Sequence, residues 1–282
     1  MSTNVEHARS ALKAMVKGFL RARGLHVGDY DRVTAALSKA RMYDNLEERI
    51  KFLTHLDHEA MTRVLPFLPY THSQIGQDLF VLSQIGPKLN GYFVEFGATD
   101  GINISNSYFF ESHLGWNGIV AEPGRLWHRD LTRNRKCKIE KRCVWSVTGA
   151  ELQFLDAGPL STISGFEAND YHAQERLKNN SYTVRTISLN DLLAEHNAPA
   201  HIDYLSIDTE GSEFAILEKF DFDKHTFGVI TCEHNHAQQR GDIHRLLAAN
   251  GYRRIMEDAS SVDDWYVLSD PRPSCETTFV EP

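Results

Sequence analysis

From residue 90 onward, short apolar runs rich in β-formers alternate with helical segments, and this alternation constrains the fold more than any other feature. The runs typical of strands are Tyr92–Phe96, Gly118–Ala121, Lys138–Trp145, Ile202–Ile207 and Gly228–Cys232. Such alternation predicts βαβ units, and therefore a mainly parallel sheet with helices on both faces. The last two runs, Tyr252–Met256 and Asp264–Leu268, are typical of a terminal strand pair. We therefore predict an α/β fold.

The chain has 282 residues, which is enough for one α/β domain with a smaller extension. Pro66 and Pro69 punctuate the chain, so we expect an N-terminal helical extension over residues 1–70 and the α/β domain over residues 71–282. Residues 148–190 are irregular and contain two short expected strands with a long connection, which often forms a lid or a binding loop. We expect this insertion to face the substrate.

Within the extension, residues 5–23 have apolar side chains at helical spacing and basic side chains over much of the remaining surface. One interpretation is a helix that packs on the core of its own chain or on a second subunit. Packing on a second subunit would make the protein a homo-oligomer. The other is attachment to a membrane surface or to an anionic polymer. We favour packing, because most amphipathic helices of this kind simply pack.

The composition excludes several classes of protein. The formal net charge is −8, and an acidic surface repels phosphate backbones, so we expect no nucleic-acid partner. No apolar run approaches the ~20 residues that span a bilayer, and the first residues lack the apolar core of a signal peptide. The four cysteines form no CxxC pair, which is typical of reduced thiols. We therefore expect a cytoplasmic protein without a transmembrane segment.

The strand that ends at Phe96 runs into a loop with two glycines, Gly97 and Gly101. Glycine permits a positive φ and close approach of a ligand, and ligands of open parallel sheets bind beyond the carboxyl ends of the strands. The spacing Glu-x-Gly-x-x-x-Gly differs from the GxGxxG of dinucleotide sites, and Asp100 inside it would repel a pyrophosphate. That carboxylate could instead accept a hydrogen bond from an ammonium group. The loop therefore suits a cationic ligand that carries an amino acid.

The next strand is followed by Glu122, 21 positions after Gly101 (122 − 101). An acidic residue about 20 residues beyond a glycine loop can accept hydrogen bonds from ribose hydroxyls. The alternative is a surface acid in a turn before Pro123. We favour the ribose, because Glu122 directly follows an apolar strand.

Taken together, these motifs and others further along the chain resemble the FkbM-type methyltransferases, a branch of the class I enzymes that use S-adenosylmethionine. The resemblance spans roughly residues 73–268 and depends on the segments Ser73–Asp78, Phe93–Gly101, Ser105–Ser107, Ala121–Pro123, Thr186–Leu193 and Ile207–Phe214. It implies a Rossmann-like seven-stranded sheet with an antiparallel last strand, S-adenosylmethionine as cofactor, and methyl transfer to oxygen. The acceptor in this family is commonly a hydroxyl of a saccharide, a glycan or a small natural product. The chain departs from the family pattern at Asn190, where aspartate is frequent, and at Thr209, where valine is frequent.

Under this resemblance, the glycine loop, the strand ends and the start of the helix after the loop would form the cofactor site. The expected cofactor-binding residues are Glu95, Gly97, Ala98, Asp100, Gly101, Asn106, Glu122, Pro123, Val144, Trp145 and Asp208. Trp145 ends the third expected strand, where adenine would lie, so it either stacks on adenine or packs in the core.

Asp208 and Glu233 each follow or end a strand, 25 positions apart (233 − 208), so they converge if those strands are neighbours. Together with His234 and Asn235 they are candidate ligands of a divalent metal, most plausibly magnesium or manganese. Such a metal would hold substrate oxygens and lower the pKa of the acceptor hydroxyl, an arrangement that resembles the catechol-type O-methyltransferases. In the metal-free alternative, His234 or His236 is the general base and an acid orients it. The expected catalytic residues are Asp208, Glu233 and His234.

Two other functions stay open on the sequence. The chain could methylate a nitrogen, a carboxylate or a peptide, or it could be a non-catalytic scaffold that kept the fold. The many acidic residues expected near the site weigh against a scaffold, because burying carboxylates that serve no function is costly.

Overall fold

The computed structural model describes most of the chain, and the statements below concern the described residues. These are residues 48–158, 161–163, 180–234 and 239–269. Contacts divide the chain after Glu48, and the second unit, residues 49–282, contains all the other described residues. The helix expected over residues 5–23 lies outside the described residues. Among the described helices, none combines the length and the hydropathy that crossing a bilayer requires.

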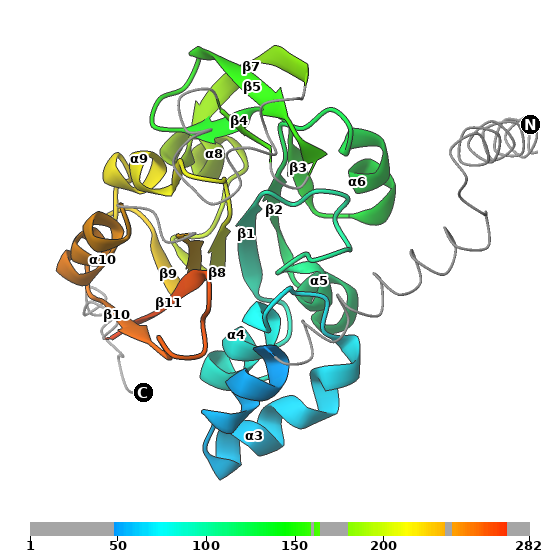
Figure 1. Ribbon diagram of the computed structural model, residues 1–282, viewed down its shortest axis with the longest axis vertical. Coiled ribbons are helices and arrows are strands. Elements are labelled where there is room, and N and C mark those ends of the chain that lie inside the picture. The colour runs from blue at the N-terminus through cyan, green and yellow to red at the C-terminus, as the bar shows by residue number, and fades with distance from the viewer. Residues whose placement is uncertain (1–47, 159–160, 164–179, 235–238, 270–282) are drawn as a thin grey trace, which may run out of the picture. The chain divides into compact units, whose positions relative to one another are not determined.

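The centre of the fold is a seven-stranded sheet that is parallel apart from one strand (Figure 1). Its strands are β1 (Tyr92–Phe96), β2 (Asn117–Ala121), β3 (Lys138–Glu140), β8 (His201–Ile207), β9 (Thr226–Glu233), β10 (Tyr252–Ile255) and β11 (Asp263–Leu268). Their order across the sheet is β10-β11-β9-β8-β1-β2-β3. Strand β11, the last in sequence, runs antiparallel to both of its neighbours. The expected sheet of seven mainly parallel strands with an antiparallel last strand is thus confirmed.

Side-chain alternation along the strands gives this sheet two apolar faces. On β1, Val94 and Phe96 lie in one core cluster, and Phe93 lies in the other. The first cluster includes side chains of α8 (Leu189–Glu195), α9 (Glu213–Glu218) and α10 (Arg240–Ala249). The second includes side chains of α3 (His58–Val64), η1 (Leu65–Tyr70), α4 (Gln77–Ile85), α5 (Tyr108–Leu114) and α6 (His128–Asn134). Because helices cover both faces (Figure 1), a polar site is expected at an end of the strands rather than on a face.

A second, four-stranded sheet has the order β4-β7-β5-β6. Its strands are β4 (Cys143–Trp145), β5 (Glu151–Asp156), β6 (Thr162–Ile163) and β7 (Asn180–Ser188). The two strands expected within residues 148–190 correspond to β5 and β7, which pair antiparallel over six residues each. This pairing joins the two ends of the irregular segment in a small sheet.

The prediction of one continuous strand over residues 138–145 is wrong. The segment is divided into β3 and β4, which belong to different sheets. Lys141 and Arg142 separate the two strands, and the Arg142 guanidinium lies 2.7 Å from Glu140 and 2.6 Å from Glu195. These two ion pairs hold the chain in the turn that takes it out of the main sheet.

Candidate active site

The two central strands, β1 and β8, mark a reversal in the strand order. From β1 the chain continues through β2 and β3 on one side, and from β8 it continues to β9 on the other. In open α/β sheets, ligands bind beyond the carboxyl ends of the strands at such a switch point. The loops that follow β1 and β8 are in close contact here, since a Cβ placed on Gly97 would lie 2.2 Å from the Asp208 carbonyl oxygen. With a φ of +75° as well, this position requires glycine.

Glu95, on β1, holds the loop between β1 and α5. Its carboxylate accepts hydrogen bonds from the Ser105 hydroxyl (2.9 Å), the Asn106 N–H (2.7 Å) and the Ser107 hydroxyl. The buried Arg135 guanidinium lies 3.4 Å from the same carboxylate. This network is fully buried and fixes the path of the loop.

Other residues of this loop also contact the protein itself. The Asp100 carboxylate accepts hydrogen bonds from two backbone N–H groups of its own turn. A Cβ on Gly101 would lie 2.6 Å from Cγ of Arg135, so the glycine allows α6 to pack closely. The Asn106 side chain donates a hydrogen bond of 2.9 Å to the Ser206 hydroxyl of β8. The loop is therefore a rigid, internally bonded support at the switch point.

A cavity that is partly open to solvent lies beyond the strand ends. Five of the expected cofactor-binding residues line it: Gly97, Glu122, Pro123, Val144 and Asp208. The other six, which do not line it, are Glu95, Ala98, Asp100, Gly101, Asn106 and Trp145. The structure adds Phe96, Thr99, Ile104, Ala121, Cys143, Phe154, Gly158, Ser161, Thr162, Ile163, Thr209, Glu210 and Ser212. The cavity thus has acidic groups from the main sheet and apolar groups from the second sheet.

The apolar side of the cavity is the part that the sequence analysis largely missed. Cys143 and Val144 come from β4, Phe154 from β5 and Ile163 from β6. Burial raises the pKa of the Cys143 thiol to about 12, so this side chain behaves as a small apolar group. Trp145 packs instead against the core cluster of the second sheet. No local motif marks these residues, because strand pairing across the 148–190 segment brings them to the site.

Glu122 follows β2 and is 4% exposed. One carboxylate oxygen accepts a hydrogen bond from the Thr99 N–H (2.8 Å) and the other from the Gly124 N–H (2.7 Å). Burial raises the pKa of Glu122 to about 7, although both backbone hydrogen bonds oppose the rise. The alternative of a surface acid is wrong. Two backbone donors instead hold this carboxyl group in place at the cavity wall.

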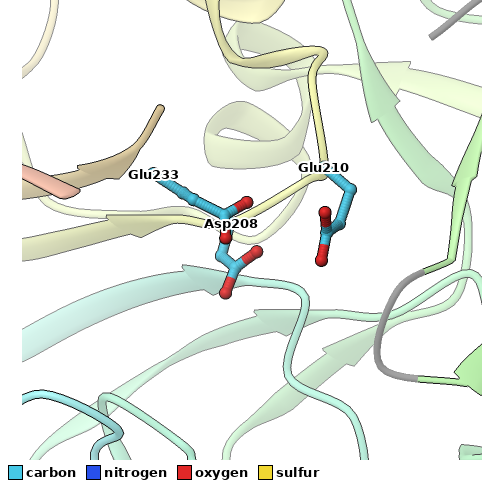
Figure 2. Close-up of side chains that lie close together, drawn as sticks. All are labelled: Asp208, Glu210 and Glu233. Carbon is cyan, nitrogen blue, oxygen red and sulfur yellow. The ribbon is translucent and has the colours of Figure 1, made fainter. Parts of the chain in front are cut away.

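Three carboxyl groups, those of Asp208, Glu210 and Glu233, converge near the ends of β8 and β9 (Figure 2). One oxygen from each lies within 4.8 Å of the others. Glu210 reaches this place with a left-handed backbone, φ +58°, and its carbonyl accepts a hydrogen bond of 2.8 Å from the Thr162 hydroxyl. We call these three residues the acidic trio. Such a trio can either share protons or hold a divalent cation.

Two members of the acidic trio, Asp208 and Glu233, have pKa values raised by burial and by the charges of nearby carboxylates. Burial raises the pKa of Asp208 to about 6, although a hydrogen bond with Glu233 opposes the rise. Burial, and then the charge of Asp208, raise the pKa of Glu233 well above its usual range. Because two buried carboxylates this close repel each other, the pair favours a state in which the two groups share a proton.

His234 lies on a different side of the β9 end from the acidic trio. Its Nε2 is 3.9 Å from Asp264, and the histidine neither lines the cavity nor belongs to the cluster of possible metal ligands. Asn235, the fourth expected ligand, lies outside the described residues. The structure places Glu210 beside the two expected carboxylates instead.

A further buried carboxyl group, that of Asp263, lies on β11 opposite Glu233. It accepts hydrogen bonds from the Gln77 side chain (3.0 Å) and the Trp265 indole (3.4 Å). Burial, and then the charge of Asp208, raise its pKa to about 7. The Ser73–Asp78 segment thus contributes Gln77 to the support of the site.

Comparisons with known proteins bear on this site. A family model described as methyltransferase FkbM domain matches residues 95–254, which is 160 of the 282 residues (254 − 95 + 1). Among solved structures, the chain is similar to a crystal structure of precorrin-6y C5,15-methyltransferase from Geobacter metallireducens GS-15. The identity is 10%, over 69% of this chain and 87% of that chain, with a TM-score of 0.37. No curated protein matches the chain.

Proposed function

The chain belongs to the methyltransferase FkbM family, and from this premise we propose that it transfers a methyl group from S-adenosylmethionine to a hydroxyl oxygen of a saccharide, a glycan or a small natural product. One observation carries the proposal. Glu122 and Asp208 line the same cavity at the switch point of the sheet, and Glu233 hydrogen-bonds to Asp208. These acids come from the ends of three different strands.

The groups around the cavity fit S-adenosylmethionine. The cofactor carries two positive groups, a sulfonium and an ammonium, and the carboxyl groups of Glu122, Asp208 and Glu210 line this cavity. A carboxylate has about four acceptor positions, and Glu122 uses two for backbone N–H groups, so it retains acceptors for a ribose diol. Phe154 and Ile163 offer apolar surface suited to a flat base. When bound, the cofactor supplies a methyl group on a sulfonium that leaves as a neutral thioether.

The acceptor hydroxyl must lose a proton as its oxygen takes the methyl group. We assign this proton to the Asp208 carboxylate, which is ionised above pH ~6 and lies in the cavity. Glu233 holds its own proton and donates it to Asp208, which keeps the base oriented. The alignment of the two reacting atoms supplies most of the remaining rate, as in other displacements between bound partners.

A divalent cation on the acidic trio is the second candidate mechanism. The observation that favours it is the spacing of three carboxylate oxygens from Asp208, Glu210 and Glu233, all within 4.8 Å of one another. Hard oxygen donors suit magnesium or manganese, which would polarise the acceptor hydroxyl. Binding would require the proton held by Glu233 to leave, so affinity for the cation should rise with pH. Turnover that survives thorough chelation with EDTA supports the Asp208 base, whereas turnover that magnesium restores supports the cation.

The proposed reaction is tested by incubating the protein with S-adenosylmethionine and a panel of hydroxylated acceptors, and by measuring S-adenosylhomocysteine and the methylated product. Treatment of the product with base separates acceptor classes, because methyl esters hydrolyse and methyl ethers persist. A base-stable product on oxygen is expected. A base-labile product or one methylated on nitrogen would contradict the hydroxyl assignment. If the cofactor binds but no acceptor of any class is methylated, the scaffold interpretation is favoured.

A further inference from the structure

A second concavity lies next to the cavity and shares Pro123 with it. Its basic side chains are those of Arg125, His128, Lys141, Arg142 and Arg185, and we call it the basic pocket. These residues come from the loop after β2, from α6, from the turn between β3 and β4, and from β7. The chain as a whole carries a net charge of −8, so this concentration of cationic groups runs against its overall composition.

Only part of this positive charge is neutralised by the protein. Arg142 lies in ion pairs with Glu140 and Glu195, and Arg185 lies 3.8 Å from an exposed glutamate on β5. In the described part of the chain, Arg125 and Lys141 have no carboxylate within 4.0 Å. Among the described residues, the basic pocket therefore retains two positive charges without a carboxylate partner.

Arg125 is held in position before any ligand arrives. Its guanidinium stacks over the Tyr182 ring, 4.1 Å from the centroid, and its backbone N–H donates a hydrogen bond of 2.8 Å to the Tyr182 hydroxyl. Its Nη2 donates to the Thr183 carbonyl at 3.3 Å. A guanidinium has five N–H donors, so most remain for a ligand. A planar fork held in this way is suited to two-point recognition of a phosphate.

His128 connects the basic pocket with the cavity. Burial lowers the pKa of His128, and a hydrogen bond to the Glu122 carbonyl raises it. The charges of Lys141 and Arg125 lower it further, whereas the charge of Asp156 raises it. Its Nε2 lies 2.9 Å from that carbonyl oxygen. Glu122, whose side chain lines the cavity, is thus hydrogen-bonded through its backbone carbonyl to His128 of the basic pocket.

We propose that the basic pocket binds a phosphate group, and that the methyl acceptor carries this group. Phosphate binding is inferred from the charges and contacts above. The claim that the methyl acceptor carries the phosphate rests on the proposed function. Two positive charges without a carboxylate partner, one of them on a stacked arginine, and a shared wall with the cavity together distinguish this pocket from a solvated basic surface. A free phosphate ion would present the same chemistry, so the test separates the two sources.

The test measures binding of inorganic phosphate, a hexose phosphate and the matching neutral hexose by calorimetry with the full chain. The Arg125→Ala/Lys141→Ala variant is compared with Arg253→Ala/Lys51→Ala, which removes the same charge from exposed positions outside the pocket. We expect phosphate to bind the parent and the control with the same affinity. Its affinity for the pocket variant should be lower by a factor of at least about ten. Absence of phosphate binding by the parent, or equal affinity in the pocket variant, overturns the pocket.

The same titrations locate the source of the phosphate. Tighter binding of the hexose phosphate than of inorganic phosphate, with little binding of the neutral hexose, supports a phosphorylated acceptor. Equal binding of the two phosphates overturns the acceptor's part of the proposal. S-adenosylmethionine is titrated in parallel, and its affinity should be unchanged in both variants. A protein that binds phosphate but not S-adenosylmethionine would contradict the proposed function and leave the basic pocket standing.

Discussion

Asp208 and Glu233 form a hydrogen bond with each other although they lie 25 positions apart in the chain (233 − 208). The parallel register of β8 and β9 explains this, because it pairs Ile207 with Cys232, one residue before each acid. Neighbouring parallel strands therefore deliver two carboxyl groups to one point. The proposed chemistry depends on this pair.

Replacing either member by its amide tests the pair with little change in shape. Asp208→Asn removes the proton acceptor, and Glu233→Gln removes the carboxyl group that orients it. We expect turnover to fall about 10²- to 10⁴-fold in each variant, the range of a positioned general base. Affinity for S-adenosylhomocysteine, measured by calorimetry, should stay within a few-fold of the parent. Full activity in either variant would remove that residue from the mechanism.

The pH dependence of turnover should reflect the raised pKa of Asp208. Burial is the main cause of a pKa of about 6, and the base acts only when ionised. The rate should therefore be constant above about pH 7 and fall tenfold per unit well below pH 6. A steady-state profile of kcat between pH 4.5 and 8.5 measures this. A kcat that stays constant down to pH 4.5 contradicts the assignment of Asp208 as the base.

Asp263 should make the fold less stable as the pH rises. Burial raises its pKa from 3.8 to about 7, so between these values the folded chain binds more protons than the unfolded chain. The free energy of unfolding then falls as pH increases through this window, by a few kcal/mol at most, on the order of 1.4 kcal/mol per unit of pKa shift. Asp263→Asn keeps an acceptor for Gln77 and should flatten this decline. Urea unfolding of both proteins at pH 5 and pH 8 gives the free energy of unfolding at each pH. The same decrease from pH 5 to pH 8 in both proteins would count against the buried acid.

Gly97→Ala should disrupt the switch point. The new Cβ would lie 2.2 Å from the Asp208 carbonyl oxygen, and φ there is +75°. Gly149→Ala is the matched control, because φ is +86° but no atom lies within 4 Å of the new Cβ. We expect the control to lose about 1 kcal/mol of stability from backbone strain. The Gly97 variant should lose several kcal/mol and its activity, through displacement of Asp208. Equal losses in the two variants would show that the contact does not matter.

The sequence predicts the main sheet well because its strands are buried runs with clear ends. Glu122, Asp208 and Glu233 could be located for the same reason, since each sits where such a run stops. The division of residues 138–145 into two strands could not be located, because the segment contains no glycine or proline that would mark a turn. The turn at Arg142 depends on an ion pair with Glu195, which is distant in sequence.

The sequence already contained a reason to place His234 away from Glu233. Successive residues of an extended chain point to opposite sides, so Glu233 and His234 could not both face the same pocket. The structure follows this rule: Glu233 joins the acidic trio, whereas His234 lies near Asp264. The antiparallel register of β11 and β9 pairs Asp263 with Glu233. The apolar wall of the cavity had no such signal, because it comes from pairing between β4, β5, β6 and β7.

The proposed reaction requires a cofactor bound at the switch point beside Glu122. Calorimetric titration of S-adenosylhomocysteine into the parent and into Glu122→Ala tests this most directly, with thermal unfolding of both proteins as the check on folding. We predict saturable binding by the parent, at least tenfold weaker binding by the variant, and a smaller change in folding than in affinity. No binding by the parent, or the same affinity in both proteins, would contradict it.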